Sequence, residues 1–411
     1  MNDQRAEGRR LTTREVAERL GVKPETVYAY VSRGQLSSRR GAGSKGSTFD
    51  PEEVDALVRK GRREPARGGD VTQQIDTGIT LIEKDRYYFR GVDAVQLARR
   101  HGYEEIADWL WTGVLQPGIR FTAPEETLAV ARRAVASLPG TAGPTDRLRV
   151  AAVAAATCDP LRFDLSPDTV LGTARGLIPT LVDALPTVGR CRADERRLAP
   201  RLWSRLTERR ADATSIRALD TALALLIDHD LAASTLAVRV AASAHSHPYA
   251  VVSAGLGALE GPLHGAASGL AHRMLTEVME RGSAAPVVAD HLRAGRRIPG
   301  LGHRLYPGQD PRAEALFEVL EELPAAHDAV NAAREVAATT ARHADLHANV
   351  DLALAALSVA ARMPAEAGET IFAVARTAGW IAHAIEEYEE RPLRMRPSGR
   401  YTGPRPPRPV P

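Results

Sequence analysis

The chain has 411 residues, 44% of them apolar and 26% charged, which is an ordinary balance for a globular protein. This composition excludes a wholly disordered chain and a disulfide scaffold, and the length suggests two or three domains. Apolar runs stay under ten residues and charges fill the first twenty positions, so we expect neither a membrane-spanning helix nor a secretory signal. Cys158 and Cys191 lie far apart without a CxxC pattern, which indicates reduced thiols in a cytoplasmic protein and no metal site.

Charge is unevenly distributed along the chain. Residues 1–67 hold 15 Lys and Arg against 10 Asp and Glu, a net charge of +5, whereas the remaining residues hold 39 against 41, a net charge of −2. A small basic N-terminal unit therefore precedes a nearly neutral body, and such asymmetry is a hint of nucleic-acid contact.

The first 61 residues predict a small helical domain. Thr12 and Glu15 have the spacing of a capping box, which opens a first helix that Gly21 ends. Pro24 occupies a first-turn position of a second helix that closes at Gly34. Two short helices joined by a glycine-containing turn predict a helix-turn-helix.

The rest of this domain follows in order. A basic, glycine-rich stretch over residues 39–46 predicts a hairpin or wing, and a third helix starts at residues 50–53 and ends by Gly61. The polar residues 62–70 predict a linker to the body.

The strings LTTREVAERLGVKPETVYAYVSRGQL and FDPEEVDAL make this unit resemble the MerR/excisionase-like winged helix-turn-helix family. The resemblance implies that the second helix enters the major groove and that the wing meets the backbone. The implied DNA-contact residues are Thr26, Tyr28, Ala29 and Arg33 near the groove-facing side, with Arg39, Arg40 and Lys45 toward phosphates. The alternative is a module that only docks on its own body or on a partner.

The body is predicted to be nearly all-α. Aromatic residues make up only 5% of the chain and alternating β-branched runs are scarce, while segments rich in Ala, Leu, Arg and Glu favour helices. The expected helices cover residues 125–138, 218–227, 232–244, 313–322, 352–361 and 373–389. Residues 77–88 predict a short hairpin or extended arm, and residues 404–411 form a proline-rich tail without assigned chemistry.

Four polar constellations interrupt the glycine-rich or apolar surroundings of the body. They lie around His264, around His303 with Arg304 and Arg312, around Asp351 at the head of an apolar helix, and from Arg376 to Arg396. Each has an ordinary structural explanation when taken singly, because a lone His is usually structural, an Asp before a helix is usually a cap, and an Arg near a chain end is usually solvated.

Together, these constellations resemble the citrate synthase family. The matching strings are ITLIEKDRYYFRGVDAVQLA, DHDLAASTLAVRV, HPYAVVSAGLGALEGPLHG, PGLGHRLYPGQDPRAEAL, NVDLALAAL, ARTAGWIAHAIEE and RPSGRYTGP, in family order from about residue 75 to 403. The resemblance implies an all-α, citrate synthase-like fold of two domains, usually dimeric. The implied division is a large domain over 71–265 and 362–403, with a small domain over 266–361.

The resemblance also implies a reaction of the tricarboxylic acid cycle, the condensation of acetyl-CoA with oxaloacetate to citrate and free CoA. Asp351 would be the base that removes the methyl proton. His264 would donate to the thioester carbonyl and stabilise the enol, and His303 would polarise the ketone and protonate the new alkoxide. No cofactor is implied, because acetyl-CoA is a substrate.

The family pattern also implies how the substrates bind. Arg312, Arg376 and Arg396 occupy its carboxylate-binding positions, with Arg396 acting across a homodimer interface, and His229 is a further oxaloacetate contact. Arg304 is a candidate for a CoA phosphate. The pair in His245-Ser246-His247 lacks further ligands at suitable spacing, so no metal is expected.

The chain departs from the family pattern at two places near the implied site. The common HGGANE reads HGAASG here, and the common NAST reads AAST. These changes leave open a 2-methylcitrate synthase using propionyl-CoA, since one methyl group changes binding by only about 1–3 kcal/mol. They also leave open a DNA-binding regulator that uses the body as a metabolite sensor.

Overall fold

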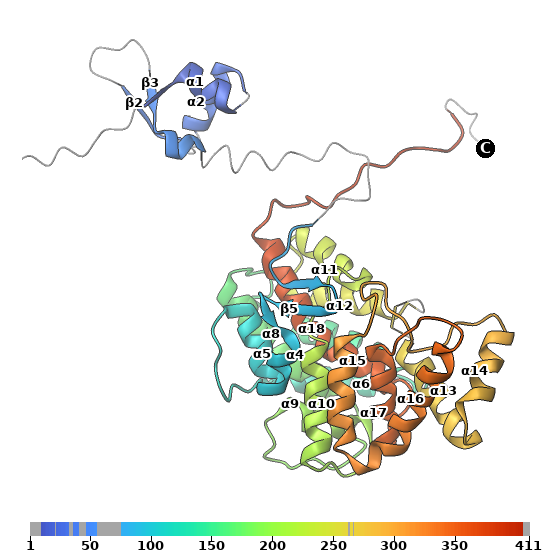
Figure 1. Cartoon of the computed structure of the whole chain (residues 1–411). Coiled ribbons are helices and arrows are strands. Elements are labelled where there is room, and N and C mark those ends of the chain that lie inside the picture. The colour runs from blue at the N-terminus through green and yellow to red at the C-terminus, as the bar shows by residue number, and fades with distance from the viewer. Residues whose placement is uncertain are drawn as a thin grey trace, which may run out of the picture. The chain divides into compact units, whose positions relative to one another are not determined.

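A computed structural model describes residues 10–20, 22–32, 36–40, 47–55, 75–261, 264–265 and 267–405 (Figure 1). The chain forms two compact units, residues 1–74 with 397–411, and residues 75–396. The predicted linker over 62–70 and part of the tail over 404–411 lie outside the described residues.

The N-terminal unit is a helix-turn-helix with a small sheet. Its elements are α1 (Thr13–Leu20), α2 (Pro24–Ser32), β1 (Leu11–Thr12), β2 (Ser38–Arg40) and β3 (Ser47–Phe49), and the antiparallel strand order is β1-β3-β2. The predicted capping box is present, because Thr12 N–H donates to Glu15 Oε2 (2.8 Å) and Glu15 N–H donates to Thr12 Oγ1 (3.3 Å). Residues 51–55 are helical.

A separate apolar core holds this unit together. Its buried members are Val16, Ala17, Val27, Leu36, Phe49 and Val54. Strand β3 brings Phe49 onto the two helices, and β2 pairs with β3 through Arg39 opposite Thr48. The expected wing is thus a hairpin whose tip, residues 41–46, lies outside the described residues.

The body is helical, as predicted, and begins with the expected hairpin. The strands are β4 (Thr80–Glu83), β5 (Arg86–Phe89) and β6 (Val92–Asp93), antiparallel in that order. The helices are α4 (Ala94–Arg100), α5 (Tyr103–Thr112), α6 (Glu125–Ala136), α7 (Pro144–Thr157), α8 (Pro167–Ala184), α9 (Leu198–Leu206), α10 (Ala213–Leu225), α11 (Ala233–Ser243), α12 (Pro248–Leu259), α13 (Ala267–Arg281), α14 (Ala284–Arg293), α15 (Pro311–Glu321), α16 (His327–Ala341), α17 (Val350–Ala360) and α18 (Ala367–Tyr388).

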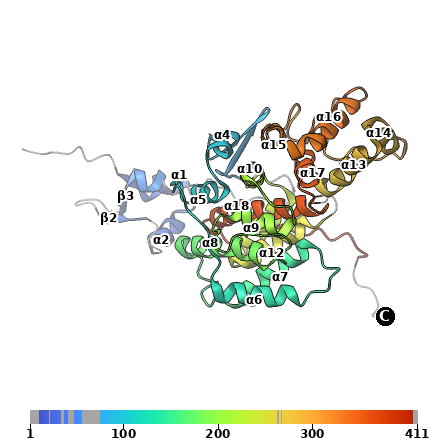
Figure 2. The same cartoon turned by 90° about the horizontal axis from the view of Figure 1, so that it is seen from below.

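Helix α18 is the centre of the body. It packs against α5, α8, α10, α11, α12 and α17. Figure 2 shows α5, α8, α10, α12 and α17 around it. Most of its residues are buried, so it is apolar nearly all round, as expected for a core helix. Polar residues on such a helix need partners inside the protein, and Arg376 and His383 are two buried polar residues of this kind.

Helices α13 to α17 pack on one another and lie together in both views (Figures 1 and 2). They fall within the small domain predicted over 266–361, whose boundaries stay a prediction. No helix among the described residues is long and apolar enough to span a membrane.

Two helix boundaries were predicted wrongly. The helix expected over 218–227 begins at Ala213, because the side chain of Asp212 accepts a hydrogen bond from Ser215 N–H (2.7 Å) and caps it. The helix expected over 373–389 begins at Ala367, where Gly368 lies so close to Ser268 that a Cβ would stand 2.7 Å from the serine Cβ. That glycine serves helix packing rather than helix termination.

Candidate active site

Three aromatic side chains with polar atoms meet at the end of α10. His229 follows that helix, and its Nε2 lies 2.7 Å from the hydroxyl of Tyr306. The ring of His303 lies edge-on to His229 at 5.0 Å between centroids and 4.9 Å from the Tyr306 ring. Residues almost eighty positions apart in sequence therefore form one contiguous cluster.

The loop that carries His303 is fastened to the segment before α17. Gly300 C=O accepts from Asn349 N–H (2.9 Å), and Gly302 N–H donates to His347 C=O (2.7 Å). Gly300 has φ +76°, and a Cβ there would lie 2.7 Å from that of Leu352, so the position requires glycine. These contacts bring the His303 loop to the helix that begins beside Asp351.

A buried ion pair joins the same two segments. Arg312 and Asp310 pair through two hydrogen bonds, Nε to Oδ1 (2.9 Å) and Nη2 to Oδ2 (2.8 Å). Asp310 Oδ2 also accepts from the N–H of Val350 (3.0 Å), the first residue of α17. Arg312 thereby lies next to the start of α17, where Asn349 caps the helix by accepting from Asp351 N–H (3.0 Å).

Asp351 is therefore not the helix cap, and its carboxyl group is left for other contacts. Burial raises the pKa of Asp351 to about 6, with Asp310 adding to the rise and Arg312 opposing it. The carboxyl group is partly buried and accepts no hydrogen bond among the described residues. A carboxylate in that state is a stronger base than one in water.

His264 approaches the cluster from the turn after α12. Its Nε2 lies 2.8 Å from the hydroxyl of Ser234, and its ring centroid lies 6.3 Å from that of Phe372. The guanidinium of Arg376, one turn along α18, lies over the same phenyl ring at 4.6 Å. His264 and Arg376 thus both contact the ring of Phe372.

Arg376 is almost completely buried and carries a charge without an opposite partner in direct contact. Its Nε donates to Leu226 C=O (2.9 Å), and it forms no ion pair with a carboxylate among the described residues. Burial lowers its pKa to about 10, although Asp228 opposes that change. An uncompensated guanidinium inside a protein is a binding position for an anion.

The three imidazoles are neutral near physiological pH. Burial, reinforced by Arg312, lowers the pKa of His303 to about 4. Burial, with Arg312 and Arg376 nearby, also lowers the pKa of His229 well below its ordinary value. Burial and Arg376 also lower the pKa of His264. Leu305 N–H donates to His303 Nδ1 (3.1 Å), which leaves the proton of the neutral ring on Nε2 as a donor.

The structure leaves two predicted binding residues at the surface. Arg304 is exposed on the His303 loop, and Arg396 is exposed beyond the end of α18. Neither side chain makes a hydrogen bond or ion pair within the described part of the chain. His247, one of the two histidines considered as metal ligands, caps α12, because its Nδ1 accepts a hydrogen bond from Ala250 N–H (3.1 Å). No group of three metal-binding side chains occurs among the described residues.

The predicted DNA-contact residues are only partly described. Thr26 is exposed, Tyr28 is 54% exposed on α2, and Arg39 is exposed on β2. Arg33 and Lys45 lie outside the described residues, as do the side chains of Ala29 and Arg40.

The family model described as citrate synthase, C-terminal domain, matches residues 70–398, and the helix-turn-helix domain model matches residues 10–62. The chain belongs to the citrate synthase family. Its body is thus that of a citrate synthase-like enzyme, and a helix-turn-helix domain precedes the body in the sequence.

Relatives agree with this assignment. A citrate synthase of Haloferax volcanii is 30% identical over 80% of this chain and 93% of its own length. A 2-methylcitrate synthase of Corynebacterium glutamicum is 26% identical over 85% of this chain and 96% of its own. The crystal structure of citrate synthase from Pyrobaculum aerophilum superposes with a TM-score of 0.70 at 26% identity, covering 83% of this chain and 93% of that chain.

Four residues that contact the predicted site residues were not themselves predicted from the sequence to have a function. Tyr306, Phe372, Ser234 and Asp310 all contact predicted site residues. Tyr306, Ser234 and Asp310 stand inside strings that match the family, which was the available signal. Phe372 gave none, because an aromatic residue one turn before an arginine on a buried helix is ordinarily core.

Proposed function

We propose that this chain condenses acetyl-CoA with oxaloacetate to give citrate and free CoA. The observation that carries the proposal is that neutral imidazoles, a carboxyl group with a raised pKa and two buried guanidinium groups lie close enough to act on one another electrostatically. This combination suits a reaction that removes a weakly acidic proton beside a dianionic substrate.

Asp351 acts as the base. It takes a proton from the methyl carbon of the thioester, whose acidity is far below that of a carboxylic acid, so the enolate oxygen needs a donor as the proton leaves. His264 supplies that donor. This role requires the tautomer with the proton on Nδ1, in which Nε2 accepts a hydrogen bond from the Ser234 hydroxyl 2.8 Å away.

His303 activates the second substrate. Its Nε2–H donates to the ketone oxygen of oxaloacetate while the enol carbon forms the new carbon–carbon bond to the ketone carbon. The proton passes to the developing alkoxide, and water then cleaves the thioester to release CoA. The hydrogen bond from Leu305 N–H fixes the tautomer that this step needs.

Two buried arginines and His229 bind the dicarboxylate. Arg312 is held rigid by Asp310, and Arg376 has guanidinium nitrogens left for a carboxylate. Arg396 completes the site from the partner subunit. Arg304, exposed on the loop of His303, meets a CoA phosphate.

A homodimer is part of this proposal, because Arg396 serves the partner's site. Two exposed apolar side chains one turn apart on α11 support a second copy as the occupant of this face. They are Leu236 (45% exposed) and Val240 (47%).

Release of free CoA from acetyl-CoA and oxaloacetate by the purified full chain tests the proposal. Turnover that depends on both substrates supports it, and no release above background overturns it. The alternative, 2-methylcitrate synthesis, predicts a higher kcat/KM for propionyl-CoA than for acetyl-CoA in the same assay. The similarity to the Corynebacterium glutamicum enzyme is the observation that keeps this alternative in view.

A second function, DNA-binding regulation by the N-terminal unit, is favoured by the exposed Tyr28 on α2 with Arg39 exposed on the wing strand. Retention of a random-sequence duplex pool at low salt, with selection of particular sequences, tests it. Replacing Tyr28 and Arg39 by Ala weakens retention, whereas Arg14→Ala, an exposed arginine on α1, does not. Oxaloacetate or CoA changes the retention if the body is a sensor, and no binding at low salt rules this function out.

A further inference from the structure

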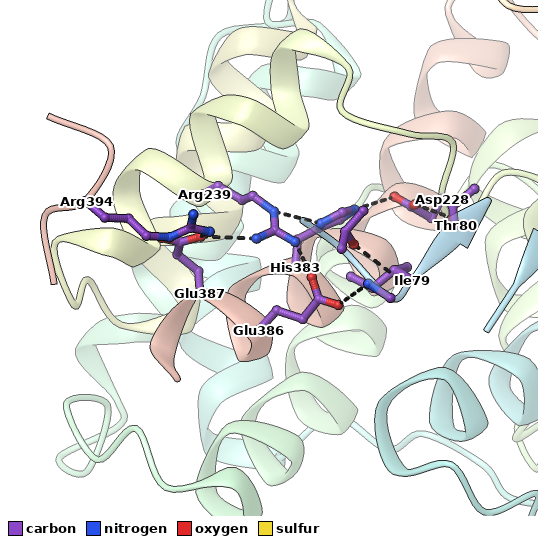
Figure 3. Close-up of polar contacts among 10 residues, drawn as sticks. Ile79, Thr80, Asp228, Arg239, His383, Glu386, Glu387 and Arg394 are labelled. Atoms are coloured by element: carbon purple, nitrogen blue, oxygen red, sulfur yellow. Dashed lines mark hydrogen bonds and ion pairs between the residues drawn. The ribbon is translucent and has the colours of Figure 1, made fainter. Parts of the chain in front are cut away.

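A chain of buried polar groups runs through the body beside the site (Figure 3). At its centre is Arg239 of α11, whose side chain is fully buried. Its Nε donates to His383 Nδ1 (3.0 Å), Nη1 donates to Glu387 Oε2 (3.1 Å), and Nη2 donates to Glu386. The helix α18 supplies all three acceptors.

One end of this series of polar groups lies at the candidate site. His383 Nε2 lies 3.2 Å from Asp228 Oδ1, and Thr80 Oγ1 donates to Asp228 Oδ2 (2.5 Å). Asp228 directly precedes His229 in sequence, and its charge acts on Arg376. This end therefore lies next to two of the groups proposed to bind the dicarboxylate.

The other end of this series of polar groups forms hydrogen bonds with the segment that follows α18. Arg394 donates from Nε to Glu387 Oε1 (2.8 Å) and from Nη2 to Glu387 Oε2 (2.6 Å), a two-bond geometry that fixes direction as well as distance. Glu387 is fully buried, whereas the Arg394 side chain is 24% exposed. A buried carboxylate thus links the core arginine Arg239 to an arginine of the C-terminal segment.

The backbone of that segment is also constrained. Leu393 has φ +57°, a left-handed conformation that costs a leucine free energy and persists only where the surroundings enforce it. Leu393 N–H donates to Ser243 C=O at the end of α11 (2.7 Å), and Arg396 N–H donates to Leu393 C=O (3.2 Å). A strained backbone at Leu393 and an ion pair at Arg394 therefore constrain the chain three and two residues before Arg396.

We infer that Glu387 and Arg394 are positioning residues that aim Arg396 at the oxaloacetate bound by the partner subunit. The inference rests on the proposed function, since it takes Arg396 as a carboxylate-binding residue acting across a dimer. Stability alone is a weak reason for the arrangement, because an apolar core of the same volume is often as stable as a buried ion pair. The buried ion pair is explained if it fixes the direction in which the exposed Arg396 points.

Arg394→Ala is the direct test, with Arg391→Ala as the matched control. Arg391 is an exposed arginine three residues earlier in the same segment. We expect Arg394→Ala to raise the KM for oxaloacetate about tenfold while kcat and the KM for acetyl-CoA change by less than about twofold. Arg394→Lys, which keeps the charge but loses the two-bond geometry, gives an intermediate KM. A urea unfolding curve of each variant establishes that it is folded.

Mixed dimers separate positioning in the partner's site from a local effect. A subunit with Arg394→Ala is paired with a subunit carrying Asp351→Asn, so that the one working site receives Arg396 from a segment with Arg394 intact. We expect a wild-type KM for oxaloacetate. Placing both substitutions on one subunit beside a wild-type partner gives a working site served by the altered segment, and its KM is raised about tenfold.

Three outcomes overturn the inference. The first is an unchanged KM in Arg394→Ala, and the second is a raised KM in the first mixed dimer, which would show an effect within the same subunit. The third is an unchanged KM in Arg396→Ala, which removes the role of the residue being positioned. In each case, CoA release by the wild-type dimer still decides the proposed function separately.

Discussion

The replacement Asp351→Asn tests the site most directly, because it changes one charge and almost no volume. Asn cannot remove the methyl proton, and loss of a positioned general base lowers turnover by about 10²–10⁴-fold. Burial raises the pKa of Asp351 from 3.8 to about 6, equivalent to about 3 kcal/mol of unfavourable ionisation in the folded protein. The same replacement is therefore expected to make the protein more stable near neutral pH, by up to about 3 kcal/mol.

The sign of this stability change follows from proton binding. Between pH 3.8 and about 6 the folded state holds a proton on Asp351 that the unfolded state has lost, so the wild-type free energy of unfolding falls as the pH rises through this window. The Asn variant has no such group. Its stability advantage is thus absent below the window and complete above it.

Two assays read the two effects separately. CoA release gives turnover, and urea unfolding at a series of pH values gives the free energy of unfolding. Asp345→Asn is the matched control, since this aspartate lies six residues earlier and is 93% exposed, and a change within about 0.5 kcal/mol is expected there. Retained turnover in Asp351→Asn would refute its role as the base, and lower stability near neutral pH would refute the assignment of a desolvated charge.

Further predictions follow from individual contacts. For the wild type, kcat/KM rises with pH through about 6 as Asp351 loses its proton, and a profile that is flat there contradicts this assignment. Ser234→Ala removes the hydroxyl beside His264 and is expected to lower kcat about tenfold with little change in KM for either substrate, as measured by CoA release. Gly300→Ala strains a backbone with φ +76° and pushes a methyl group against Leu352, so its free energy of unfolding, from urea curves, drops by about 1–3 kcal/mol.

Local signals in the sequence were sufficient for much of the fold. The pair Thr12 and Glu15 satisfies each other's backbone groups, so the start of α1 could be predicted from four residues alone. A short hairpin or extended arm was predicted over 77–88, and the structure has the hairpin of β4 and β5 there. The start of α10 was missed although Asp212 is a good cap, because the expected range followed the apolar run rather than the cap.

The site was harder to predict because it depends on long-range contacts. Nothing in the residues near His303 indicates that its loop hydrogen-bonds to residues 347–349. The resemblance to the family identified the candidate site residues, whereas their burial and pKa shifts follow only from the structure. The buried chain through Arg239 was not anticipated, because an arginine on an Ala-rich helix ordinarily faces solvent.

A single physical cause, removal of water, explains the opposite pKa shifts within the cluster. Desolvation disfavours every charged form, so it lowers the pKa of His303 and raises that of Asp351. It thereby produces neutral hydrogen-bond donors beside a strengthened base, the pairing that enolisation requires. Arg376 is the exception that needs explanation, because it stays charged while buried and lacks a contacting carboxylate among the described residues. A bound dianion would supply the missing charge, so a cluster with this unpaired guanidinium is consistent with the dianionic substrate of the proposed function.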